Sequence, residues 1–123
     1  MKIVNVTIGG EKRVLCYSLR VVNAIEDAFG GEAEMRAKLS SGKTSQAIDV
    51  TTWLMAQMMA AGKQYADKNG IPCPAPLSQD DLLDNCDVND MLEMQMQIQN
   101  ALAVGSQQDV QAESKNAEAT PAR

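Results

Sequence analysis

The spacing of apolar residues changes at Ser18, and this change constrains the fold more than any other feature of the sequence. Residues 2–18 alternate and are rich in β-branched side chains, as is typical of a half-buried strand. Beyond Ser18, apolar residues recur three or four positions apart, which is the spacing of one face of an α-helix. We therefore expect an α+β fold, mainly α, with an N-terminal β-hairpin packed on a bundle of about four to five helices.

Gly9-Gly10 divides the alternating segment into two strands, Lys2–Ile8 and Lys12–Tyr17. Two turn lengths are possible at this point. A three-residue loop places Val6 opposite Val14, which keeps the apolar face continuous, whereas a two-residue loop places Val6 opposite Arg13. We favour the three-residue loop for this reason.

A two-stranded hairpin is marginally stable alone in water, so its apolar face must pack on another part of the chain or on a partner. The helices that follow are the obvious candidates, and the helix that begins after Ser18 is the nearest of them. Its predicted apolar stripe is formed by Leu19, Val22, Ile25 and Phe29, and we expect this stripe to cover the hairpin.

Capping residues, glycines and prolines divide the rest of the chain into helical segments. The expected helices span about 19–29, 32–39, 45–69, 79–85 and 88–104. The third is the longest and should be the central helix. Three prolines within 72–76 predict a stiff loop before the fourth helix, and Gly105 is expected to end the fifth. We expect one domain over residues 1–105 and a disordered polar tail over residues 106–123.

The composition argues against several classes of function. A net charge of −5 disfavours nucleic acid and acidic membranes as partners, and no apolar stretch is long enough to cross a bilayer. The chain has no histidine and three scattered cysteines, which predict neither a zinc site nor a catalytic triad. We expect a protein that is not an enzyme, needs no cofactor or metal, and resides in the cytoplasm.

Methionine is the most unusual component, with eight residues concentrated on the third and fifth predicted helices. Methionine commonly fills irregular gaps in a core, and this interpretation accounts for about two in three of them. The methionines at 91, 94 and 96 cannot all lie on one narrow helical face, nor can those at 55, 58 and 59 together with Trp53, so some should be accessible to a partner. The candidate partner-binding residues are Trp53, Met55, Met59, Met94 and Met96.

The order of the predicted elements resembles that of a known protein family. A short hairpin leads through Tyr17-Ser18-Leu19 into a helix that ends with AIEDAFGG at residues 24–31. A central apolar helix, a loop, a short helix with an acidic cap and a last amphipathic helix follow. Over about residues 1–104 this order resembles the tail assembly chaperone family of long-tailed, siphovirus-like phages and prophages. The resemblance rests on order and spacing rather than on a diagnostic motif.

The resemblance implies a chaperone that binds and solubilises the long helical tape measure protein while the phage tail is assembled. It also implies residence in the bacterial host cytoplasm and a second partner, a frameshifted longer form of the same chain. Self-association is compatible with the sequence. Two other classes stay open, namely a minor structural tail or neck subunit retained in the virion and an acidic inhibitor that mimics DNA.

Overall fold

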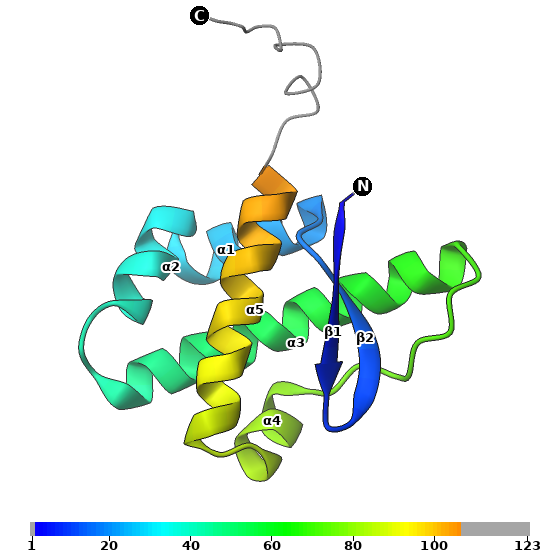
Figure 1. Ribbon diagram of the computed structural model, residues 1–123. Helices are drawn as coiled ribbons and strands as arrows, with labels where there is room; N and C mark the ends of the chain where they lie inside the picture. Colours follow the sequence, from blue (N-terminus) through cyan, green and yellow to red (C-terminus); the bar gives the residue numbers. More distant parts are fainter. Residues whose placement is uncertain (1, 107–123) are drawn as a thin grey trace, which may run out of the picture.

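The computed structural model describes residues 2–106, which form a two-stranded hairpin and five helices (Figure 1). The predicted α+β, mainly α, fold is confirmed. The expected disordered tail lies outside the described residues, except for Ser106, which is the last residue of a helix. The elements are β1 (Ile3–Ile8), β2 (Glu11–Cys16), α1 (Leu19–Phe29), α2 (Glu32–Leu39), α3 (Thr44–Lys68), α4 (Gln79–Asn85) and α5 (Val88–Ser106).

Helix α3 is the centre of the molecule, as its length and apolar content predict. It contacts β2 and each of the other helices, and Figure 1 shows it passing behind α5 and the hairpin. Apolar and small residues lie around most of its circumference, so the helix is buried on several sides at once. Its buried residues include Val50, Leu54, Met55, Met58, Met59, Ala61 and Gly62.

The register of the hairpin differs from the predicted one. Val6 pairs with Arg13, and the turn contains only Gly9 and Gly10. Both glycines have positive φ angles, 61° and 79°, which suit the two-residue turn that matches the natural twist of a hairpin. Arg13 does not disrupt the buried face because its guanidinium Nη1 donates a hydrogen bond to the carbonyl oxygen of Ala75 at 2.7 Å.

Helix α1 does not cover the hairpin, contrary to the prediction. The hairpin lies against α3 through β2 and against α5 through β1, while α1 packs on α2 and α3. The predicted stripe on α1 is only half right, because Ile25 is buried and Phe29 packs on the core, whereas Leu19 is 82% exposed and Val22 is 38% exposed. Val21, which was not in the predicted stripe, is buried instead. The long helix α3 presents a wider apolar surface than the eleven residues of α1, and β2 packs there instead.

The proline-rich loop between α3 and α4 is held in place by two cationic side chains. Arg13 binds the carbonyl of Ala75, and Lys63 Nζ donates to the carbonyl oxygen of Cys73 at 2.8 Å. Ser78 then begins α4 with a capping box, in which its hydroxyl accepts from the Asp81 amide and the Asp81 carboxylate accepts from the Ser78 amide. The two cationic side chains hold the loop, and the capping box fixes the start of α4.

Helix α5 extends beyond its predicted end. Gly105 was expected to stop the helix after Val104, yet the helix continues through Gly105 to Ser106. A Cβ atom at position 105 would lie 2.6 Å from the Tyr17 Cβ, so the glycine is needed for close packing and not for termination. At the other end Asp87 and Asp90 cap the helix reciprocally.

Candidate functional site

Three of the five predicted partner-binding residues lie in the core. Met55, Met59 and Met94 are 0%, 2% and 3% exposed, so their predicted placement on an accessible surface is wrong. Their flexible thioethers fill the space around α3, which is enclosed by β2, α5 and the other helices. Met35 and Met58 are buried in the same way.

The other two predicted residues remain accessible but lie apart. Trp53 is half-buried, and its ring packs edge-on against Phe29 with centroids 5.2 Å apart. It borders a shallow hollow with Pro76 and Gln79. Met96 lies on α5 and is 64% exposed. The structure does not bring these two side chains into one site.

Met96 belongs to a row of exposed apolar side chains that the sequence prediction missed. On α5, Val88 and Leu92 are 70% and 54% exposed and precede Met96 at four-residue intervals, so the three lie on one face. Leu83 of α4 is 41% exposed and borders the same hollow as Val88. We call Leu83, Val88, Leu92 and Met96 the apolar row. Aligned exposed apolar residues of this kind indicate a protein-binding surface.

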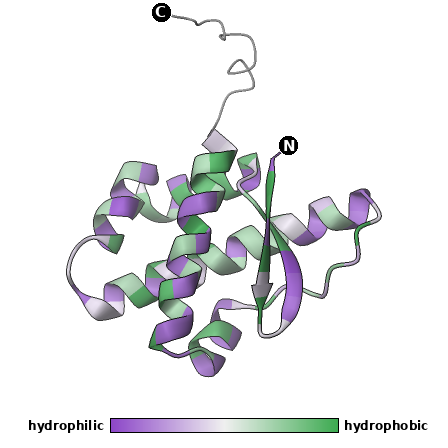
Figure 2. Ribbon diagram, viewed as in Figure 1, coloured by the Kyte–Doolittle hydropathy of each residue, from purple (hydrophilic) through white to green (hydrophobic). Residues whose placement is uncertain are grey.

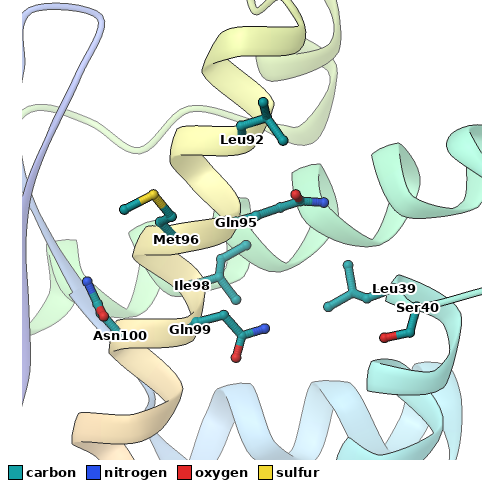
Figure 3. A pocket seen from close by; sticks show the side chains of 8 residues that line it. All are labelled: Leu39, Ser40, Leu92, Gln95, Met96, Ile98, Gln99 and Asn100. Carbon is teal, nitrogen blue, oxygen red and sulfur yellow. The ribbon is translucent and has the colours of Figure 1, made fainter.

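A groove of about 560 Å³ lies beside the apolar row, between α5 and the end of α2 (Figure 3). Leu92, Met96 and Ile98 line it from α5, and Leu39 with Ser40 faces them from α2. The remaining lining residues are Gln95, Gln99 and Asn100, so no charged side chain lines the groove. Its chemistry suits an apolar segment whose polar atoms can bond to amides.

Hydrogen bonds fix two of the amide side chains with which α5 lines the groove. Gln95 Nε2 donates to the Thr51 hydroxyl of α3 at 3.3 Å, and Gln99 Oε1 accepts from Arg36 Nη1 of α2 at 3.0 Å. These bonds hold α5 against the two neighbouring helices. Leu92 and Met96 have no such constraint and present their apolar surface outward (Figure 3).

Tyr17 connects the groove to the hairpin through a chain of hydrogen bonds. Its hydroxyl donates to Glu32 at 2.7 Å, and Arg36 donates to the same carboxylate at 2.8 Å as well as to Gln99. Burial, followed by the bond to Glu32, raises the pKa of Tyr17, while the Tyr17 bond lowers the pKa of Glu32. The network therefore favours a neutral phenol and an ionised carboxylate.

A smaller hollow of about 190 Å³ continues the surface at the junction of α4 and α5. Leu83, Val88 and Met91 line it, and Ile48 of α3 closes its base. The apolar row thus lies between two concave regions, which is an arrangement suited to the side chains of a docked helix.

The titratable groups of the described chain do not form a reactive centre of a familiar kind. Burial raises the pKa of the Cys16 thiol, and burial together with the Asp90 and Asp87 carboxylates raises the pKa of Cys86. Both thiols are thus protonated and weakly nucleophilic at neutral pH. Within residues 2–106, no cluster of carboxylates and cysteines has the geometry to hold a metal ion.

The sequence contains a signal for the apolar row, which lies outside the predicted stripe of the last helix. Positions 88, 92 and 96 form a second apolar stripe beside the buried stripe of Met94, Ile98 and Leu102. Figure 2 shows hydrophobic and hydrophilic residues interspersed along α5 rather than separated on two sides. A helix with two apolar stripes has one available for a partner.

The comparisons with known proteins do not identify a relative. No family model, no curated protein and no solved structure matches the chain. Among the described helices, none combines the length and the hydropathy of a bilayer-spanning segment. The exposed apolar surface of α4 and α5 is therefore the feature that bears on the function of this protein.

Proposed function

We propose that this protein is a tail assembly chaperone of a long-tailed phage or prophage, which binds an apolar helical segment of the tape measure protein. The observation that carries the proposal is the apolar row beside an uncharged groove. The resemblance in the order of hairpin, central helix, acidic-capped helix and last amphipathic helix gives the proposal its particular partner.

The proposed mechanism is coverage of apolar surface. A tape measure helix exposes long apolar stripes before the tail tube surrounds it, and such stripes aggregate in water. Docking on the apolar row would remove these side chains from solvent, as in other complexes in which an amphipathic helix occupies a groove. The net charge of −5 would keep the complex soluble.

Co-expression with a tape measure protein from the phage or prophage that would encode this chain tests the proposal. The expected result is that the tape measure protein moves from the pellet to the supernatant and co-purifies with the chaperone. The double variant Leu92→Glu and Met96→Glu should abolish this effect because it places two charges on the docking surface. Both side chains are more than half exposed, so the variant should still fold.

The chain offers a matched control for this variant. Leu19→Glu and Val22→Glu make the same kind of change at two exposed apolar positions of α1, on a different part of the molecule. This control should leave the solubility of the tape measure protein unchanged. Equal loss in both variants, or stoichiometric recovery of the chain in purified particles, would contradict the proposal. The second outcome would instead identify a minor structural subunit of the tail or neck.

A further inference from the structure

Positive and negative charges are distributed unequally along residues 1–106. Residues 1–68 contain nine Lys and Arg against seven Asp and Glu, a net charge of +2. Residues 69–106 contain no Lys or Arg and six carboxylates, a net charge of −6. The second part comprises the proline-rich loop, α4 and α5. It carries Asp80, Asp81, Asp84, Asp87, Asp90 and Glu93.

Three of these carboxylates, those of Asp84, Asp87 and Glu93, lie near the apolar row, whereas Asp81 and Asp90 line a pocket that faces the hairpin. Asp84 follows Leu83 on α4, and Asp87 lines the junction hollow together with Leu83 and Val88. On α5, Glu93 lies roughly 60° around the helix from Met96, on the flank of the apolar face. All of these carboxylates belong to exposed residues, and none forms an ion pair within residues 2–106.

We infer that the apolar row selects an amphipathic helix whose apolar face is flanked by Lys or Arg. This inference rests on the proposed function and narrows the class of partner. The two surfaces would be complementary in charge. Lys or Arg side chains beside the apolar face of the partner helix would meet carboxylates that form no ion pair within residues 2–106. A helix with Asp or Glu beside its apolar face would meet the like charges of Asp84, Asp87 and Glu93, whereas the uncharged groove itself would accept the apolar side chains of either helix.

Three labelled peptides of about 18 residues test this selection by fluorescence anisotropy. The first has leucines at helical spacing with lysines on both flanks, the second has glutamates in place of the lysines, and the third contains the residues of the first in scrambled order. The full-length chain should bind the first peptide at least about tenfold more tightly than the second or the third. The difference between the first two should narrow at about 0.5 M salt, where exposed charges are screened.

Variants of the protein test whether this surface is responsible for the preference between the peptides. Asp84→Lys with Glu93→Lys should weaken binding of the lysine peptide and strengthen binding of the glutamate peptide. The matched control is Glu26→Lys with Asp27→Lys, which changes the net charge equally on α1. The control should have little effect, because the exposed carboxylates of α1 belong to a different helix from the apolar row. Loss of binding in Leu92→Glu with Met96→Glu confirms that the apolar face is required.

Several outcomes would overturn the inference. Equal affinity for the lysine and glutamate peptides would show that the surface binds a helix without selecting its charge. Equal affinity for the lysine peptide and its scrambled form would show that binding depends only on attraction between net charges. Binding of none of the peptides, with a dimer in sedimentation that Met96→Glu dissociates, would show that a second copy occupies the surface. Binding of none by a monomer would also overturn it. Solubilisation of the tape measure protein is scored separately, so the proposed function can survive each of these results.

Discussion

At the scale of single residues, Gly62 allows the closest approach between two elements of the fold. It lies in the C-terminal half of α3, where β2 packs, and a Cβ atom there would overlap the carbonyl of Val14. Glycine weakens a helix interior by about 1 kcal/mol relative to alanine, so its presence in α3 is explained by packing rather than by helix formation.

Gly62→Ala should therefore destabilise the protein despite the better helix propensity of alanine. We expect a loss of about 2 kcal/mol or more in the free energy of unfolding, because α3 and β2 must separate to admit the methyl group. Urea unfolding followed by circular dichroism measures this change. Gln64→Ala, at an exposed position of the same helix, is the control and should be nearly neutral. A gain of stability in Gly62→Ala would contradict the close approach.

Side-chain burial was the part of the site that the sequence predicted least well. The pattern predicts the stripe that contains Ile98 and Leu102, and both are buried. It does not separate Met94 from Met96, because methionine suits a core and an adaptable surface equally. Burial of Met55 and Met59 depends on which elements enclose α3, and this is set by contacts between distant segments.

At the scale of elements, Tyr17 joins the end of the hairpin to α2 and, through Arg36, to α5. The hydrogen bond lowers the pKa of Glu32 below its ordinary value of 4.5, so its contribution to stability is present above that pH and is lost as the pH falls through the lowered value. The raised pKa of Tyr17 has the opposite consequence, because its contribution is present below the ordinary value of 10 and is lost at more alkaline pH.

Tyr17→Phe should accordingly reduce stability by about 1 kcal/mol between about pH 6 and pH 9, since Glu32 is partly exposed and the bond is weakened by solvent. The difference from the native protein should shrink in acid, where Glu32 is protonated, and above pH 10. Thermal unfolding across this pH range provides the measurement. Tyr65→Phe is the control, and the same pH-dependent difference in that variant would contradict the role of the Tyr17–Glu32 bond.

The boundaries of the elements were largely predictable, because they depend on local signals. Ser18 precedes α1, Gly30 follows it in a left-handed conformation, and Ser78 caps α4 as its sequence predicts. Contacts between elements were less predictable. The face of α1 and the partner of the hairpin depend on how α3 divides its surface among its neighbours, and no local pattern in the sequence encodes this division.

At the scale of the whole molecule, α3 contacts β2 and each of the other helices, so the fold should lose its structure in one step. Leu54 is 0% exposed on α3, and Leu54→Ala should lower the free energy of unfolding by about 2 to 5 kcal/mol. Circular dichroism and the fluorescence of Trp53, the only tryptophan, should report the same midpoint in urea.

The exposed Leu92 provides the control for this substitution. Leu92→Ala removes the same atoms from the surface of α5 and should change stability by less than about 1 kcal/mol. Two separate transitions in Leu54→Ala would show that the α4 and α5 region unfolds independently of α3. Such a result would contradict a single cooperative unit.

The bond between Arg13 and Ala75 has a consequence for the register of the hairpin. A hairpin that is shifted by one residue would direct Arg13 to the opposite face, where its guanidinium could not reach the proline-rich loop. Only the native register therefore binds the loop, although the loop lies more than fifty residues later in the chain. We therefore expect this bond to favour the native register over the shifted one, so that a segment 62 residues later in the chain helps to determine how the first two strands pair.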